Sequence, residues 1–410
     1  MIWNKLLIPL YARPDWKQLD ERFKYYPGID VENLKEPYVL PHIHHAFYFS
    51  VSPSDFPTIF KEKTNEEYYY FPMPISLSRA EELYSDVTLE PKIIKDVKDK
   101  KCKFLVVSGM EGWHWKFFEK IPNALHEKYG FDHSDFVFAT GNAKDYEGLK
   151  IIYHNWWELN LAQDFTFYKN MMLPVITGTK LRPRKFIFLN RRPSYSRIAA
   201  VTYMHDYISE GFMSLAKGDR WGRDWFLRNY HEAIEMYPSI FKQYPNVQII
   251  NKVPLIIHDG VNAEIENPVD DTSHEKFMQS YIHIVAETFL DYDPNRLFFS
   301  EKMFKPMRYM QPFILLGEPY SLAKLKDLGY KTFSDYWDES YDEILDDELR
   351  LKAALDTAKK LIDTGHGALH ELTLQTLPIL RHNLAHLSYR SLMQDQQYKV
   401  ELAAYLKPER

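Results

Sequence analysis

Glu301, Lys302 and Lys305 are the residues whose types and spacing most clearly point to chemistry. Residues three positions apart lie on one face of a helix, so the two ammonium groups can reach the same phosphate. The carboxylate of Glu301 can accept hydrogen bonds from sugar hydroxyls. The three residues therefore predict a site for an anionic ligand that carries a sugar.

A second group of chemically suitable residues follows the apolar run over 185–190. Asn190, Arg191 and Arg197 lie where this run passes into a helical pattern. A helix N-terminus carries positive potential, so arginines in such a turn favour an anion there. Residues 180–228 contain 11 Lys and Arg against 4 Asp and Glu. A solvated basic loop is the alternative interpretation of this stretch.

The segments that must position these residues alternate between strand and helix patterns, which predicts parallel sheets in an α/β fold. Predicted strands cover 104–109, 136–141, 149–153, 185–190, 247–250, 281–286 and 313–316. Predicted helices cover 115–128, 195–210, the segment beginning at Glu301, 344–364, 367–392 and 394–406. In such a fold, ligands bind at the carboxyl ends of the strands, where both basic groups lie.

The length of 410 residues predicts more than one core. A Gly- and Pro-containing basic segment, 177–184, separates two α/β halves and is interpreted as a linker. We expect an N-terminal acceptor-side domain over 1–180, a donor-binding domain over 181–345 and a C-terminal helical segment over 346–410. The two α/β halves are expected to be Rossmann-like domains facing a cleft.

The bulk composition favours a cytoplasmic globular protein. The single cysteine, Cys102, excludes an intramolecular disulfide and favours a reducing compartment. No apolar run approaches the length of a membrane span, and the N-terminus lacks a signal-peptide pattern, so we expect no membrane contact. The net charge of −6 argues against a protein that binds polyanions over its whole surface.

The ordered set of Asn190, Arg197, Glu287 and the Glu-Lys-x-x-Lys-Pro pattern resembles a known family. It is similar to the donor-binding half of GT-B glycosyltransferases of the α1,3-fucosyltransferase type, over about residues 185–345. It also looks like phage-encoded glycosyltransferases that share Glu-Lys-x-x-Lys-Pro. The fucosyltransferases have Thr before Glu-Lys, where this chain has Ser300.

The resemblance implies a GT-B-like fold and a role for each matching residue. Arg197 and Lys302 match residues that contact the donor diphosphate, and Lys305 stands where the family has a basic residue. Glu301 matches the glutamate that binds ribose or sugar hydroxyls, and Glu287 matches the acid after the preceding strand. The implied ligand is a nucleoside diphosphate sugar used as donor substrate, without a cofactor or a metal. The implied reaction is inverting transfer to an acceptor hydroxyl.

Such a transfer also requires a base to deprotonate the acceptor hydroxyl. In a two-domain transferase the base comes from the acceptor side. Glu111 is the candidate base because small residues flank it, His114 is the alternative base, and Glu158 is a third candidate.

Two patterns that suggest metal binding have more ordinary interpretations. Asp291-Tyr292-Asp293 resembles the metal-binding Asp-x-Asp of another glycosyltransferase fold, but the following Pro294-Asn295 predicts a turn. The histidines at 42, 44 and 45 lack further ligands at site-like spacing, so a buried or loop cluster is expected.

The functional hypotheses differ mainly in the acceptor of the sugar. The phage likeness, the basic stretch and an aromatic content of 16% favour transfer onto hydroxymethylated bases of double-stranded phage DNA, which would place the protein in the host cytoplasm. A fucosyltransferase-like enzyme acting on a glycan or polysaccharide is the rival. A non-enzymatic sugar-nucleotide-binding protein is the third hypothesis, since fold does not determine function.

Overall fold

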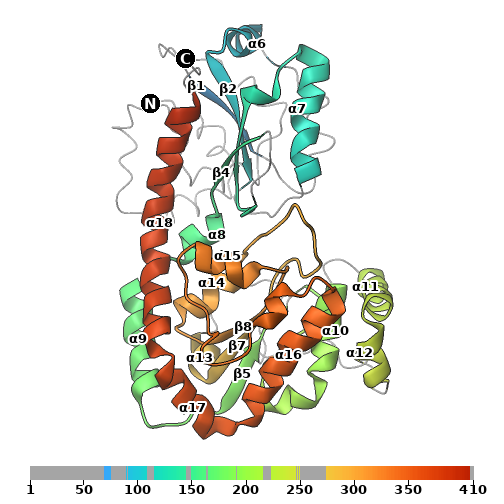
Figure 1. Ribbon diagram of the computed structural model, residues 1–410, viewed down its shortest axis with the longest axis vertical. Helices are drawn as coiled ribbons and strands as arrows, with labels where there is room; N and C mark the ends of the chain where they lie inside the picture. Colours follow the sequence, from blue (N-terminus) through green and yellow to red (C-terminus); the bar gives the residue numbers. More distant parts are fainter. Residues whose placement is uncertain are drawn as a thin grey trace, which may run out of the picture. The chain divides into compact units, whose positions relative to one another are not determined.

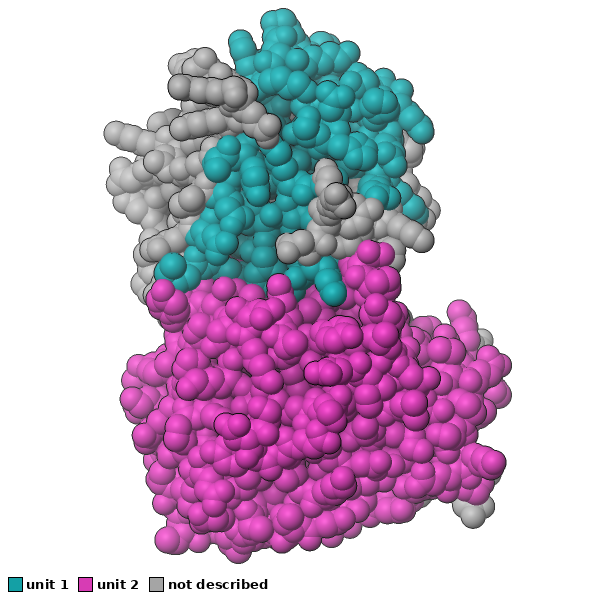
Figure 2. Space-filling view, in the orientation of Figure 1, with its two compact units in different colours: residues 1–156, 393–410 teal, residues 157–392 magenta. Residues whose placement is uncertain are grey.

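The computed structural model describes residues 69–74, 89, 91–108, 115–144, 149–162, 165–190, 192–215, 223–245, 247, 249 and 274–406. Within these ranges the chain is an α/β protein with two four-stranded parallel sheets (Figure 1). It divides into two compact units, which Figure 2 colours separately. Unit 1 comprises residues 1–156 and 393–410, and unit 2 comprises residues 157–392.

Unit 1 contains a sheet whose strands follow the chain in the order β1-β2-β3-β4. Its elements are β1 (Tyr69–Pro74), α6 (Pro91–Lys98), β2 (Cys102–Ser108), α7 (Trp115–Tyr129), a 3-10 turn (His133–Asp135), β3 (Phe136–Thr140) and β4 (Lys150–Tyr153). All residues of β3 are buried, as the apolar run predicted. Phe104 of β2 is fully buried and stacks on Phe136 with ring centroids 4.9 Å apart.

Unit 2 contains the second sheet, in the order β6-β5-β7-β8. Its first elements are α8 (Trp156–Leu161), α9 (Phe165–Thr177), β5 (Arg184–Phe188), α10 (Tyr195–Tyr203), a 3-10 helix (His205–Glu210), β6 (Gly211–Met213), α11 (Arg223–Met236) and α12 (Pro238–Gln243). Then follow α13 (His274–Met278), β7 (Ser280–Ala286), α14 (Glu301–Arg308), β8 (Phe313–Leu316), α15 (Ser321–Asp327) and a 3-10 turn (Ser340–Glu343).

Three long helices end the described chain: α16 (Asp347–Asp363), α17 (Gly365–Gln375) and α18 (Leu377–Leu406). Helix α16 contacts β8 and α10, whereas α17 contacts β5, β7 and α9. Helix α18 begins in unit 2 and ends in unit 1. Among the described residues, no helix has both the length and the apolar character needed to cross a membrane.

Most predicted elements are present, but several boundaries differ. The helix predicted over 195–210 is α-helical only to Tyr203, and a 3-10 helix follows over His205–Glu210, without a left-handed glycine at its end. Gly211 is extended instead and begins β6, where a Cβ atom would lie 2.5 Å from the ring of Phe186. The glycine therefore serves close strand packing.

One predicted strand is absent from the described residues, and one observed strand was not predicted. Val247 and Ile249, the described residues of the strand predicted over 247–250, are not in a strand, because the chain is still turning after Pro245. Strand β1 was not predicted, since Pro72 and Pro74 argue against a strand. Its place at the edge of the four described strands of its sheet explains the exception, because an edge strand leaves one row of N–H groups unpaired.

The division of the chain also differs from the predicted ranges of 1–180, 181–345 and 346–410. The units divide at 156/157, and the segment interpreted as a linker, 177–184, lies inside unit 2. Arg182 explains this, because its side chain is only 3% exposed and donates to the carbonyl of Ser280 at 2.6 Å. The break predicted near residue 393 is absent, because α18 continues through it. Thr364 separates α16 from α17, and Gly365, the first residue of α17, has a φ of 89°.

Candidate functional site

The candidate site lies where the strand order of the unit 2 sheet reverses. From β5 the chain passes to β6 on one side, and β7 then pairs with the other side of β5. At such a point the connections leave neighbouring strands in opposite directions, which opens a crevice at their carboxyl ends. The predicted site residues follow the ends of these two strands, β5 and β7.

Asn190 follows β5 and is completely buried. Its backbone N–H donates to Ser214 Oγ at 3.1 Å, which ties the end of β5 to the residue that follows β6. Neither polar atom of its side-chain amide has a hydrogen-bond partner among the described residues. Buried polar groups are nearly always paired, so this amide is a candidate ligand contact.

Arg197 connects α10 to the end of β7. Its Nη2 donates to the carbonyls of Ala286 at 3.1 Å and Glu287 at 2.7 Å, and its Nη1 donates to the carbonyl of Arg192 at 3.2 Å. Burial lowers the pKa of the guanidinium to about 10, while the carboxylates of Glu301 and Glu287 favour the charged form. Arg197 therefore remains a cation at neutral pH and holds the turn after β7 in place.

Glu287 is the buried acid of that turn and is bonded to the start of α14. Its Oε2 accepts from Ser300 Oγ at 2.5 Å and from the backbone of Thr288 at 3.0 Å, and its Oε1 accepts from the backbone of Ser300 at 3.0 Å. Burial raises the pKa of Glu287, although the Lys302 ammonium and the Ser300 hydroxyl oppose the rise. The acid thus joins the carboxyl end of β7 to the N-terminus of α14.

Lys302 extends from the first turn of α14 toward the same turn of the chain. Its Nζ donates to Glu301 Oε1 at 2.8 Å, to Ser300 Oγ at 3.1 Å and to Thr288 Oγ1 at 3.4 Å. Its side chain is 22% exposed, so Lys302 is only partly buried. Burial lowers the pKa of Lys302, and Glu301 opposes that change.

Glu301 and Lys305 complete the group on α14. Burial alone would raise the pKa of Glu301, but the charges of Lys302 and then Lys305 bring it below its ordinary value. Lys305 is half-buried and lies three residues after Lys302 in the same helix, as predicted. Ser300 caps this helix by accepting a hydrogen bond from the Lys302 backbone N–H.

The structure therefore brings Asn190, Arg197, Glu287, Glu301, Lys302 and Lys305 to one end of one sheet. Arg197 and Lys302 both contact the two-residue turn Glu287–Thr288, from two different helices. The sequence analysis did not single out Ser300 or Thr288 as site residues. Their positions directly before Glu301 and directly after Glu287 were the available signal.

The remaining candidate residues either lie outside the described residues or are buried in an ion pair. Glu111, His114, Arg191 and the histidines at 42, 44 and 45 lie outside the described residues. Glu158 is completely buried in α8 and accepts from Tyr330 Oη at 2.7 Å and Arg390 Nε at 3.1 Å. Because it lies in unit 2 and is buried in an ion pair, Glu158 is not placed to act as a base from an acceptor-side domain.

The Asp291-Tyr292-Asp293 segment forms the predicted turn. Asp293 Oδ1 accepts from the backbone of Asn295 at 2.9 Å, and Asp291 pairs with Arg296 at 3.1 Å. Within the described ranges, no three His, Cys, Asp or Glu residues group together as metal ligands would.

The described basic residues of the stretch 180–228 do not form one charged surface. Arg184, at the start of β5, and Arg192, beyond its end, are exposed at opposite ends of the strand. Arg197 is buried, and Lys185 pairs with Glu210 at 2.8 Å. An extended strand between two charges keeps them apart, so the linear density of charge overstated the local field.

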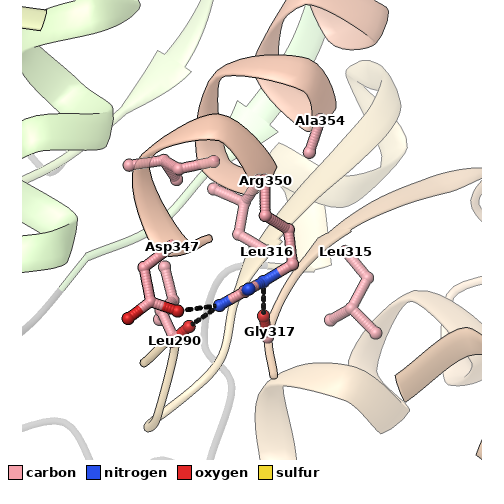
Figure 3. Close-up of a pocket in the computed structure, with 8 residues that line it drawn as sticks. Leu290, Leu315, Leu316, Gly317, Asp347, Arg350 and Ala354 are labelled. Carbon is pink, nitrogen blue, oxygen red and sulfur yellow. Dashed lines mark hydrogen bonds and ion pairs between the residues drawn. The ribbon is translucent and has the colours of Figure 1, made fainter. Parts of the chain in front are cut away.

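A small hollow lies between β8 and α16 (Figure 3). It is lined by Leu290, Leu315, Leu316, Gly317, Asp347, Arg350, Leu351 and Ala354. The guanidinium of Arg350 is engaged there by Asp347 and by the carbonyls of Gly317 and Leu290 (Figure 3). Its volume of about 10 Å³ is no more than the ~10–15 Å³ that a single water molecule needs. We assign it to packing.

No protein-family model, curated protein or solved structure matches this chain. The α/β fold with parallel sheets follows from the structure itself.

Proposed function

We propose that unit 2 binds the diphosphate of a nucleoside diphosphate sugar and that the chain is a glycosyltransferase. The observation that carries the proposal is the meeting of Arg197 and Lys302 at the Glu287–Thr288 turn, where the strand order reverses. Two cations, Arg197 and Lys302, contact this turn, and the charge of Lys305 acts on the neighbouring Glu301. This positive charge favours an anionic ligand.

The residues divide the work of the transfer in a way that their geometry supports. The Lys302 ammonium, on a partly exposed side chain, would neutralise the negative charge that develops on the leaving diphosphate. Arg197 is buried against three carbonyls, so its part is to hold the turn and to add positive potential. Glu301 would accept hydrogen bonds from the ribose or the sugar, and the unpartnered Asn190 amide offers both a donor and an acceptor.

The finer parts of the proposal follow from the family resemblance. They are a GT-B-like arrangement of two Rossmann-like domains facing a cleft, inverting chemistry without a metal, and a base in the N-terminal half. Glu111 is the proposed base and His114 the alternative. Their variants should lower turnover of the donor while leaving nucleotide binding unchanged.

Isothermal titration with GDP, UDP, CDP and ADP tests the donor site. We expect one nucleotide to bind and Lys302→Ala to weaken it by about 30-fold or more, as for loss of one partner of a buried charge pair. Lys360→Ala, an exposed lysine on α16, is the control and should bind like the wild type. Absence of binding by the wild type, or unchanged binding by Lys302→Ala, would refute the donor site.

For the acceptor, we propose hydroxymethylated bases of phage DNA, with a glycan as the rival. A gel shift with hydroxymethylcytosine-containing DNA over a range of salt concentrations separates them. No shift at low salt would exclude the DNA acceptor and leave the glycan. Nucleotide binding without any donor hydrolysis or transfer would support the non-enzymatic binding protein.

A further inference from the structure

Thr288 is the first residue after β7 that is not fully buried, and it lies beside the Lys302 ammonium. We propose that Thr288 is a further ligand-binding residue, whose hydroxyl donates a hydrogen bond to a phosphate oxygen neutralised by Lys302. This inference rests on the proposed function, because it names a contact to the diphosphate of the same ligand.

The backbone at Thr288 is held from both sides. Its N–H donates to Glu287 Oε2 at 3.0 Å, while the carbonyl just before it, that of Glu287, accepts from Arg197 Nη2 at 2.7 Å. A hydroxyl on a backbone restrained in this way has little freedom to lose when a ligand binds. Such preorganisation increases the affinity that one hydrogen bond can add.

Of the groups that contact Lys302, Thr288 is the one that can donate a hydrogen bond to a ligand. Ser300 Oγ already donates its only hydroxyl proton to Glu287 Oε2 at 2.5 Å, and Glu301 as a carboxylate can only accept. Thr288 Oγ1 accepts from Lys302 Nζ at 3.4 Å, and its hydroxyl donates to none of the residues that the structure describes. Of the hydroxyls that contact the ammonium, Thr288 is therefore the one with a proton left to give.

The contact that a ligand would replace is also the weakest of the three made by the ammonium. The distance of Lys302 Nζ to Thr288 Oγ1 is 3.4 Å, against 2.8 Å to Glu301 Oε1 and 3.1 Å to Ser300 Oγ. Hydrogen bonds weaken as the distance grows, so the contact with Thr288 is the one most readily exchanged. A phosphate oxygen entering there would receive hydrogen bonds from both the ammonium and the Thr288 hydroxyl.

Substitutions at Thr288 that keep or remove the hydroxyl test this proposal. Thr288→Val keeps the shape and removes the donor, and Thr288→Ser keeps the donor. We expect Thr288→Val to bind the preferred nucleoside diphosphate about tenfold more weakly, as for loss of one hydrogen bond to a charged group. Thr288→Ser should bind as the wild type does, and binding of the parent nucleoside, without phosphates, should be equal in all three proteins.

Isothermal titration with the diphosphate and with the nucleoside provides the measurement. Thr364→Val, at an exposed threonine between α16 and α17, is the matched control, and Thr288→Ala replaces the valine variant if that protein does not fold. A wild type that binds no nucleoside diphosphate overturns the proposed function and this inference together. A wild type that binds, with Thr288→Val equal to it, overturns only the role of Thr288. Equal weakening toward diphosphate and nucleoside shows an effect on the fold and likewise overturns it.

Discussion

The two sheets contain the same number of described parallel strands and differ in strand order. In unit 1 the order β1-β2-β3-β4 follows the chain, whereas in unit 2 the order β6-β5-β7-β8 reverses beside β5. Among the described strands, only those of unit 2 reverse their order, which is the arrangement at which α/β proteins bind ligands.

The polar residues described after β3 of unit 1 differ in their hydrogen bonding from those after β5 and β7 of unit 2. After β3 of unit 1, Asn142 is neutral, and its backbone and side chain bond within the same turn, to Thr140 Oγ1 and to the backbone of Lys144. After β5 and β7 of unit 2 lie an unpartnered amide, Asn190, and the buried acid Glu287, to which Arg197 is bonded. Local bonding within a turn stabilises a loop, whereas charges gathered from several elements create a site.

Among the substitutions that test this difference between the units, Arg197→Ala should have the largest effect. Arg197→Ala removes one of the cations beside two buried carboxylates and leaves three carbonyls without their donor, so we expect a loss of about 3–5 kcal/mol in the free energy of unfolding. Nucleotide binding should disappear as well, because the turn after β7 is no longer held. Chemical denaturation and isothermal titration measure both effects. Arg192→Ala, at an exposed arginine whose backbone carbonyl is retained, is the control and should change stability little.

Phe104 should separate stability from binding. Phe104→Ala removes a fully buried ring from the unit 1 sheet and should cost about 3–5 kcal/mol. Hydrogen exchange should increase in β1 to β4, with nucleotide binding unchanged. Phe188→Ala in β5 of unit 2 is the counterpart and should weaken binding, because β5 supplies Asn190. Loss of binding in Phe104→Ala would show that the nucleotide site depends on the unit 1 sheet.

Glu287 should make the stability of unit 2 depend on pH. Burial raises the pKa of Glu287, so the folded state binds the proton more tightly than the unfolded chain. Its contribution to stability is therefore lost as pH rises from the unfolded toward the folded pKa. The stability of Glu287→Gln relative to the wild type should improve as pH rises above the ordinary pKa of a glutamate. Denaturation at several pH values measures it, with the exposed Glu235→Gln as control; a constant difference would contradict the assignment.

Asn190 should show the smallest change in stability. Asn190→Ala removes an amide that makes no hydrogen bond with the described residues, so we expect the free energy of unfolding to change by less than about 1 kcal/mol while nucleotide binding weakens. Asn383→Ala is the contrast, because that buried amide exchanges two hydrogen bonds with the backbone of Lys331 and should cost about 2 kcal/mol or more. Equal losses of stability in the two variants would indicate a structural role for Asn190.

The local sequence pattern was sufficient to predict most of the strands and most of the polar residues that follow them. Apolar runs such as residues 104–106 lie in buried parallel strands. Glu301, Lys302 and Lys305 lie in a helix capped by Ser300. Both properties depend on neighbours in the chain. Local pattern failed at Gly211, whose role depends on a ring from another strand, and at 177–184, where Arg182 is buried against β7.

The sequence by itself determined the α/β class, most of the elements and the residue types suited to an anion. Only the tertiary structure decided the order of the strands, and with it that Arg197 and Lys302 meet at the Glu287–Thr288 turn. It also decided that Arg197 is buried and bonded to carbonyls while Lys302 is only partly buried. The physical reason is that burial and pairing of charges depend on contacts between residues about 90 positions apart, which no local pattern encodes.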